Sequence, residues 1–89
     1  MPPAIPGMSV TGIRGRKSGS IVLLLEEYEA IRLLDYQLMH QEEAALSMNV
    51  SRPTLTRIYD QARQKVAKAF VEGRSIIFAG GDCEIAGKF

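Results

Sequence analysis

Apolar residues recur at helical spacing over two stretches of the chain, which predicts two amphipathic helices. The first stretch covers residues 26–37, and its apolar positions lie three or four residues apart on one predicted face. These positions are Tyr28, Ile31, Leu34 and Leu38. The second stretch runs from residue 52 to residue 72, and its apolar face continues over about five turns. This face consists of Leu55, Ile58, Tyr59, Ala62, Val66, Ala69 and Phe70.

Two short apolar runs, residues 21–25 and residues 75–79, predict β-strands. Gly80 and Gly81 end the second run. A short strand needs a neighbour for its backbone hydrogen bonds. We therefore expect the two runs to pair with each other as adjacent antiparallel strands, within one chain or between two chains.

The residues between the two helical stretches predict a third helix, residues 41–48, followed by a tight turn. Ala44 and Ala45 are small enough to let a second helix cross the first one closely. Asn49 stands where the chain must reverse, and Asn tolerates the left-handed conformation better than most residues. The expected core of this unit is Ala44, Met48, Val50, Leu55 and Ile58.

Capping signals mark the start of the helix predicted from residue 52. Ser51 is a good N-cap, because its hydroxyl can accept a hydrogen bond from an exposed amide of the next turn. Pro53 fits in that first turn, where the amide that it lacks has no helical partner. The combined pattern predicts a helix-turn-helix, the unit with which many proteins enter the major groove of DNA. A plain helical hairpin with solvated polar residues is the simpler alternative.

The composition is that of one small soluble domain with a modest core: 89 residues, of which 46% are hydrophobic and 24% charged. The single cysteine, Cys83, excludes an internal disulfide and fits a reducing compartment. The longest apolar run, residues 21–25, is too short to cross a membrane. We therefore expect a cytoplasmic protein.

The net charge is only +1, but the two signs are separated along the sequence. Residues 51–70 contain one acid, Asp60, and five basic residues. The basic residues are Arg52, Arg57, Arg63, Lys65 and Lys68. Residues 1–25 contain three basic residues and no acid. Such a separation suits a protein with one face toward phosphates.

The chain divides into three predicted segments. Residues 1–20 are rich in Pro, Gly and Ser and are expected to form a flexible arm. The arm is basic through Arg14, Arg16 and Lys17. It can touch the DNA backbone or the minor groove, or it is a solvated tail. Residues 21–81 are expected to form the helix-turn-helix domain with its flanking strands, and residues 82–89 an acidic C-terminal tail.

No nucleophile–base pair, metal cluster or phosphate-binding loop can be assembled from these residues, so we expect no enzymatic activity, cofactor or metal. Glu26, Glu27 and Glu29 lie in the first turn of a predicted helix, where carboxylates favour the helix dipole. His40 stands alone before the helix at residues 41–48, and a lone histidine there is best explained as polar surface.

Five segments have a distinctive order and spacing: residues 27–33, 41–45, 50–52, 62–67 and 80–81. Through them the sequence resembles a family of small prokaryotic proteins of unknown biological role, described as predicted DNA-binding proteins. The helix-turn-helix of that family is similar to region 4 of bacterial sigma factors. The resemblance implies a mainly α fold with a three-helix core, to which the two apolar runs add a small two-stranded antiparallel β element.

The chain departs from that family at three points. The family tends to have Gly at the turn, where this chain has Asn49. It usually has a small polar residue at the start of its first helix, whereas Leu24 and Leu25 precede Glu26 here. It often has Gln or a similar residue where Pro53 stands, which removes one base-reading side chain. The last difference bears on the target sequence rather than on the mode of binding.

These observations predict a sequence-specific protein for double-stranded DNA, a transcriptional regulator that inserts the helix at residues 52–72 into the major groove. Arg57 is the leading base reader, because arginine pairs bidentately with guanine. The secondary base readers are Arg52, Pro53 and Thr56. The expected phosphate contacts are Ser51, Thr54, Arg63 and the cluster of Arg14, Arg16 and Lys17.

A protein-interaction module of the transcription machinery is the alternative. It would have the same fold, but its long apolar helix would dock on a partner such as an RNA polymerase subunit, without direct base readout. The near-zero net charge is in its favour. A homodimer is expected as well, because the apolar face over residues 59–70 is longer than the helix at residues 26–37 can cover.

Overall fold

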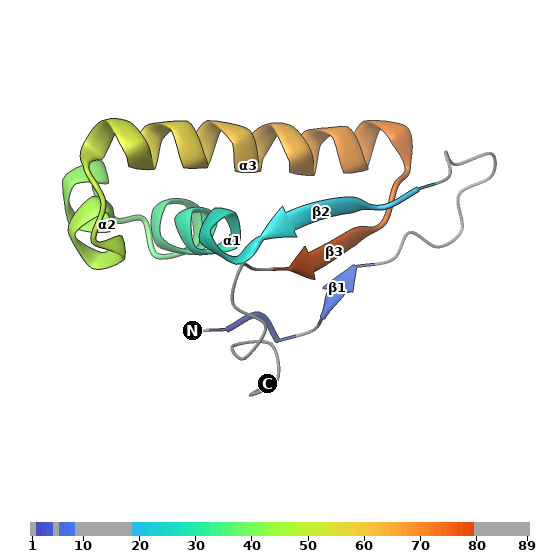
Figure 1. Ribbon diagram of the computed structural model, residues 1–89, viewed down its shortest axis with the longest axis horizontal. Coiled ribbons are helices and arrows are strands. Elements are labelled where there is room, and N and C mark those ends of the chain that lie inside the picture. The colour runs from blue at the N-terminus through green and yellow to red at the C-terminus, as the bar shows by residue number, and fades with distance from the viewer. Residues whose placement is uncertain (1, 5, 9–18, 80–89) are drawn as a thin grey trace.

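A long helix spans the molecule and lies over a small sheet and two shorter helices in the view of Figure 1. The computed structural model describes residues 2–4, 6–8 and 19–79. The helices are α1 (Leu25–Ile31), a π-helical segment η1 (Arg32–Tyr36), α2 (Gln41–Met48) and α3 (Arg52–Glu72). The strands are β1 (Gly7–Met8), β2 (Ile21–Leu24) and β3 (Ile76–Ala79). The fold is therefore mainly helical, with a small three-stranded sheet.

The two helices predicted around the tight turn are confirmed with their predicted bounds. Ser51 caps α3, since its hydroxyl oxygen accepts a hydrogen bond from the amide of Thr54 at 3.2 Å. Asn49 ends α2 in the left-handed conformation, with φ at 58°. Gly73 ends α3 in the same conformation, with φ at 66°. Short-range capping residues thus mark both ends of the turn and the end of the long helix.

The two predicted strands are neighbours, but their predicted antiparallel orientation is wrong. β2 and β3 pair in parallel, with Ile21 opposite Ile76, and the amide of Ile21 donates to the carbonyl of Ser75 at 2.9 Å. Three helices separate the strands in the sequence, and α3 returns the chain to the end of the sheet where β2 begins (Figure 1). β3 consequently runs in the same direction as β2, because a crossover through helices joins parallel strands.

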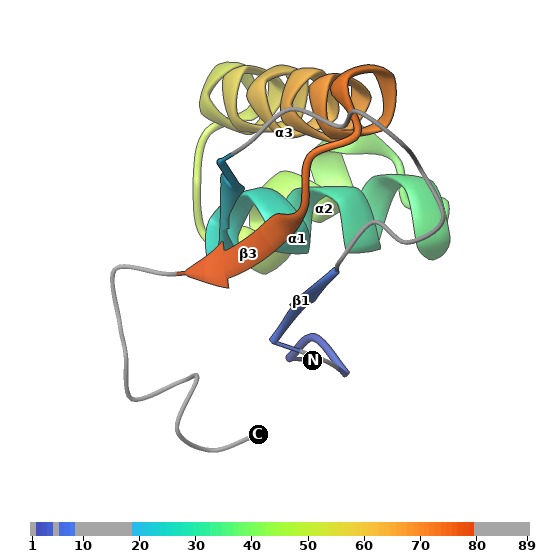
Figure 2. The same cartoon turned by 90° about the vertical axis from the view of Figure 1, so that its right-hand side faces the viewer.

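The sheet has three strands, one more than the two that were predicted. β1 pairs with β3 in antiparallel orientation, so the order in the sheet is β1-β3-β2 (Figure 2). The carbonyl of Pro6 accepts a hydrogen bond from the amide of Phe78 at 2.9 Å, which extends this pairing. A Cβ atom added to Gly7 would collide with the carbonyl oxygen of Ile76, so the close approach of β1 requires glycine. The proline and glycine residues around β1 conceal this strand in the sequence.

The single helix predicted over residues 26–37 is divided in the structure. α1 ends at Ile31, and the chain continues to Tyr36 as a π-helix, whose wider turn shifts the following side chains. Leu33 is fully buried and continues the face of Glu27 and Ala30, which are buried in α1. Leu38, which was predicted to face the core, is 77% exposed and has φ at 59°. That prediction is wrong because the helical segment ends at Tyr36 and Leu38 lies beyond it in the left-handed conformation.

The main core lies where α1 and η1 meet α2 and the first half of α3. Its buried residues are Ala30, Leu33, Ala44, Ala45, Leu55 and Ile58. Leu34, Met39, Met48, Val50 and Tyr59 pack against them. All five residues predicted for the core of the α2–α3 unit therefore lie in or against the core. Among the helices that the structure describes, none is both long and apolar enough to cross a membrane.

The apolar face predicted for α3 is only partly covered. Ala62 and Ala69 are buried, but Phe70 is 82% exposed and the adjacent Val71 is 86% exposed. The assignment of Phe70 to the covered face is therefore wrong. Large apolar side chains remain in solvent on the last two turns of α3.

A buried carboxylate ties β2, α1 and α3 together. Glu27 is 2% exposed, and its Oε1 accepts a hydrogen bond from the amide of Leu24 at 2.9 Å. The same oxygen lies 2.7 Å from Nζ of Lys65 on α3. Glu27 therefore caps α1, in place of the small polar residue that is missing before it, and anchors the middle of α3 to the end of β2.

Candidate nucleic-acid interface

α2 and α3 form a crossed pair whose connecting turn, residues 49–51, lies at one end of the molecule (Figure 1). The amide of Val50 donates to the carbonyl of Ala45 at 3.0 Å, which closes α2 as the chain reverses. Ala44 and Ala45 are buried in the core that α2 shares with α3. The first two turns of α3 are therefore fixed with one face on the core and the other face in solvent.

Arg57 projects into solvent from the second turn of α3. Its neighbours Leu55 and Ile58 are buried, whereas Arg57 itself is exposed. Within the described part of the chain, no hydrogen bond or ion pair holds its guanidinium. Pro53 lies one turn earlier on the same face and is also exposed. A guanidinium held on a fixed helix but free of partners is well placed to pair bidentately with a phosphate or with guanine.

Three other predicted contact residues surround the start of α3. The hydroxyl of Ser51 donates to Oγ1 of Thr54 at 2.8 Å, in addition to capping the helix. Nη1 of Arg52 lies 3.4 Å from Oε1 of Glu42, and both of these side chains are largely exposed, so the pair is weak. These polar groups lie at the positive end of the helix dipole, where an anion is favoured.

Thr56 has a partner inside the protein. It is half-buried, and its hydroxyl donates to Oε1 of Gln41 at 3.0 Å, which ties the second turn of α3 to the start of α2. The amide nitrogen of Gln41 is left to donate elsewhere. Gln41 was given no role from the sequence, because only the crossing of the two helices brings it beside a residue fifteen positions later.

Arg63 lies apart from the other predicted residues of α3. It follows Arg57 by six positions, which places it about 120° around the helix. Its Nη1 donates to the hydroxyl of Tyr59 at 3.2 Å, and its guanidinium lies 5.5 Å from the centre of that ring. The Tyr59 hydroxyl donates to Asp35 at 2.6 Å, and this hydrogen bond raises the pKa of Tyr59 above its ordinary value of 10.0. Arg63 therefore belongs to a polar network on one flank of the helix.

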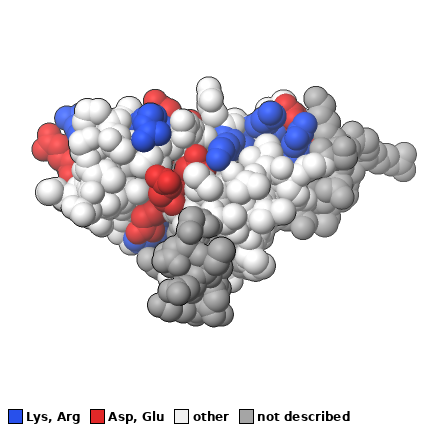
Figure 3. Space-filling view, viewed as in Figure 1, with Lys and Arg blue, Asp and Glu red and all other residues white. Residues whose placement is uncertain are grey.

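Positive charge near α3 is local rather than continuous. Figure 3 shows lysine and arginine side chains along α3 with acidic side chains among them. Glu42 and Glu43 are exposed in the first turn of α2, close to the start of α3. The predicted cluster of Arg14, Arg16 and Lys17 lies outside the described residues.

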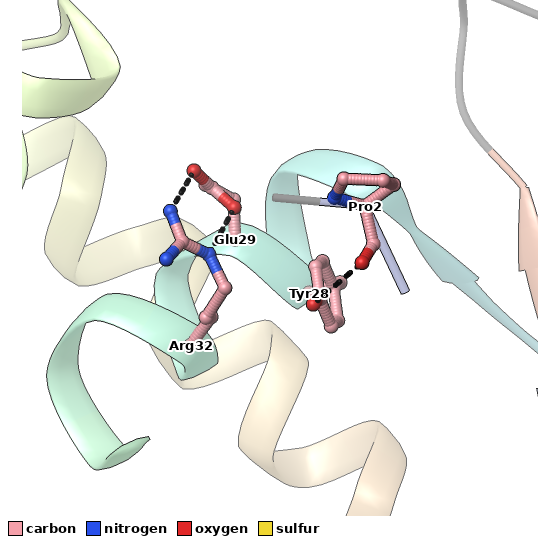
Figure 4. A network of polar contacts seen from close by, with 4 residues as sticks. All are labelled: Pro2, Tyr28, Glu29 and Arg32. Carbon is pink, nitrogen blue, oxygen red and sulfur yellow. Dashed lines mark hydrogen bonds and ion pairs between the residues drawn. The ribbon is translucent and has the colours of Figure 1, made fainter. Parts of the chain in front are cut away.

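Arg32, at the start of η1, forms an ion pair with Glu29 of α1 (Figure 4). Its Nε and Nη2 donate to the two carboxylate oxygens of Glu29 at 2.9 and 2.7 Å. These hydrogen bonds lower the pKa of Glu29 below its ordinary value of 4.5. In the same view the hydroxyl of Tyr28 donates to the carbonyl of Pro2 at 3.3 Å. The Tyr28 hydrogen bond links α1 to the N-terminal segment, and the pair of Glu29 and Arg32 links α1 to η1.

The fold and these contacts define a small, mainly helical domain with a capped and crossed helix pair at one end. A family profile matches residues 2–86, and the chain belongs to the family described as protein of unknown function DUF134.

Several relatives are named as UPF0251 proteins. The one from Halothermothrix orenii is 44% identical over 84 residues, which cover 94% of this chain and 62% of the relative. The one from Pyrococcus abyssi is 47% identical over 75 residues, covering 84% of this chain and 63% of the relative. The one from Chloroherpeton thalassium is 37% identical over 83 residues, covering 93% and 55%. The chain thus spans 55% to 63% of the length of these three relatives. No solved structure matches it significantly.

Proposed function

We propose that the α2–α3 unit is a helix-turn-helix, similar to region 4 of bacterial sigma factors, and that the protein is a cytoplasmic transcriptional regulator of double-stranded DNA. The placement of Arg57 is the observation that carries this proposal. Arg57 is exposed and unpaired within the described residues, while the opposite side of the same two helical turns is buried. A helix fixed on one face, with a free guanidinium on the other, has the form of a major-groove reader.

In the proposed complex, the first two turns of α3 lie in the major groove. Arg57 donates two hydrogen bonds to O6 and N7 of a guanine. Pro53, one turn earlier on the same face, contacts a thymine methyl group through its ring. Thr56 makes a smaller contribution to base readout, because its hydroxyl is held by Gln41. The free amide nitrogen of Gln41 donates to a neighbouring phosphate instead.

The remaining predicted residues position the protein without carrying sequence information. Ser51 and Thr54 contact phosphates beside the start of α3, and Arg52, predicted from the sequence as a secondary base reader, is assigned to a phosphate with them. Arg52 exchanges its weak pairing with Glu42 for a phosphate, which is a more highly charged partner. Arg63 contacts the backbone from the flank of the helix. The basic cluster at residues 14–17 contributes further phosphate contacts and salt dependence.

A homodimer is part of the proposal, and the exposed Phe70 and Val71 are the observation that favours it. Two adjacent large apolar side chains in solvent at the far end of α3 are typical of a protein contact. A dimer would present two copies of the α2–α3 unit to half-sites about 34 Å apart, which is one turn of DNA. Docking of the same face on a polymerase subunit is the rival function.

Selection of binding sites from random duplexes, followed by gel-shift assays, tests the proposal. We expect the wild-type protein to enrich a defined site. Arg57→Ala should lose the preference at one base position, whereas Arg63→Ala should keep the preference and weaken binding to all duplexes. If the wild-type protein enriches no site, the proposal fails and the fold is assigned to a protein-interaction function instead.

A further inference from the structure

β2 is an edge strand whose outer side carries no other strand among the described residues. In a parallel pair, alternate residues direct both backbone groups toward the partner strand. The amide of Ile21 donates to the carbonyl of Ser75, so Ile21 and Leu23 form the ladder with β3. The amide and the carbonyl of Val22 therefore point toward the free side of the sheet.

Val22 is the residue of β2 with a free donor and a free acceptor on this edge. It is 44% exposed, and no partner for its amide or carbonyl lies within the described residues. The next outward amide, that of Leu24, already donates to Glu27 at 2.9 Å. β2 contains no proline or charged residue that would block the approach of another strand.

A hollow beside this edge is lined by α3. It has a volume of about 430 Å³, and its lining residues are Gln61, Gln64, Lys65 and Lys68. Lys65 contacts the same oxygen of Glu27 that accepts from the amide of Leu24, which places the hollow next to the end of β2. Figure 3 shows mostly uncharged surface below the basic side chains of α3, with acidic side chains on its side toward α1.

The charge left over beside Val22 is the positive charge of Lys68, while the exposed Glu26 lies two residues beyond the end of β2. Lys65 is neutralised by Glu27, and Arg74 lies 2.7 Å from Glu72. Lys68 is exposed and has no partner within the described residues. A strand that approached Val22 would therefore meet one unneutralised ammonium group in the hollow above it.

We propose that the free edge of β2 binds an extended acidic segment of another protein as an added strand. The backbone of the segment pairs with Val22, and a carboxylate of the segment enters the hollow and pairs with Lys68. Main-chain hydrogen bonds supply affinity in this mode of recognition, and side-chain contacts select the partner. This binding surface is separate from the start of α3 and does not depend on the proposed DNA binding.

Electrostatic repulsion argues against a second copy of the chain as the strand that binds to β2. Antiparallel pairing of two β2 edges at Val22 would place both α3 helices on the same face of a continuous sheet. The flanks that carry Lys68 would then face each other, and the two unneutralised ammonium groups would oppose the pairing. A strand with carboxylates has the complementary charge.

Fluorescence anisotropy with two labelled ten-residue peptides tests the proposal. In one peptide Val and Thr alternate with Glu, and in the other Lys replaces Glu. We expect the Glu peptide to bind and the Lys peptide not to bind. Lys68→Gln should weaken binding of the Glu peptide about two- to fivefold, as expected for one exposed ion pair. Lys68→Glu should weaken it further, and Arg57→Gln should leave it unchanged.

The backbone contact is tested with Val22→Pro and with amide exchange. Proline removes the outward amide of Val22 but none of the hydrogen bonds to β3, so this variant should fold and should lose the Glu peptide. The Glu peptide should slow exchange of the Val22 amide and leave that of Ile21, already bonded to Ser75, unchanged. Three results would overturn the proposal. The Glu peptide does not bind, both peptides bind equally well, or the Glu peptide still binds both Lys68→Glu and Val22→Pro. If, without peptide, the Val22 amide exchanges more slowly as the protein concentration rises, the edge binds a second copy of the chain and the proposal is overturned.

Discussion

The basic side chains of α3 differ in how strongly the rest of the protein holds them. Lys65 pairs with a buried carboxylate, Arg63 stacks on Tyr59, and Arg52 makes a loose exposed pair. Arg57 and Lys68 have no partner within the described residues. Lys65 is therefore structural, whereas we assign the two free side chains to direct ligand recognition and the loosely held Arg52 and Arg63 to phosphate contacts.

The pair of Glu27 and Lys65 gives a prediction for stability. Lys65→Met should lower the free energy of unfolding by about 1–3 kcal/mol, because the carboxylate of Glu27 stays buried without its cation. Lys68→Met is the matched control, since Lys68 is exposed and unpaired, and its effect should be close to zero. Urea denaturation at neutral pH measures both. Equal stability of the two variants would show that the buried pair contributes nothing.

The pair of Glu29 and Arg32 gives a prediction for pH dependence. Folding lowers the pKa of Glu29, so its contribution to stability is fully present above its ordinary value of 4.5 and is lost as the pH falls through the folded value. The wild-type protein should therefore exceed Glu29→Gln in free energy of unfolding near neutral pH. This advantage should shrink as the pH falls below about 4.5. Urea denaturation of both proteins between pH 3 and pH 7 measures it, and an advantage that does not change with pH would contradict it.

At the scale of elements, the sequence predicts those parts of the fold that depend only on residues close together in the sequence. The bounds of α2 and α3 follow from Asn49, Ser51 and Gly73, which act within a few positions of themselves. The direction of β3 and the presence of β1 depend on where α3 returns the chain, which is a property of the whole fold. The π-helical turn after Ile31 is a third case, because the apolar spacing there also fits a regular helix.

The cap of α3 gives a prediction at this scale. Ser51→Ala should lower the free energy of unfolding by about 1 kcal/mol, because the amide of Thr54 loses its acceptor. Ser51→Thr keeps a hydroxyl at the same position and should restore most of the stability. Thermal and urea denaturation of the three proteins measure the effect. An alanine variant as stable as the wild type would mean that the cap is dispensable.

At the scale of the molecule, the candidate interface could be predicted only in part. Helical periodicity predicts that Leu55 and Ile58 face the core, and the structure agrees, with Arg57 exposed between them. Periodicity gives no information on the partner of Thr56, on the contact between Tyr59 and Asp35 that Arg63 joins, or on the free edge of β2. Each of these depends on how segments distant in the sequence lie against one another.

Self-association is predicted from the exposed end of α3. The wild-type protein should be a dimer at tens of micromolar, and Phe70→Asp should be a folded monomer, because Phe70 is 82% exposed in the single chain. Leu46→Asp is the matched control, since Leu46 is equally exposed on α2, and it should remain a dimer. Light scattering gives the mass of each protein. A wild-type monomer, with and without DNA, would refute the dimer.

The central claim is that α3 reads DNA through Arg57, and anisotropy titrations over a range of salt concentrations test it most directly. The wild-type protein should bind the selected duplex more tightly than a scrambled one, with an affinity that falls steeply as salt rises. Arg57→Ala should cost about 1–3 kcal/mol on the selected duplex, with little change on the scrambled one and none in melting temperature. Neutralising Arg14, Arg16 and Lys17 together should weaken binding to both duplexes alike and flatten the salt dependence by up to about three phosphate contacts. Absence of salt-dependent binding of the wild-type protein to any duplex would contradict the account.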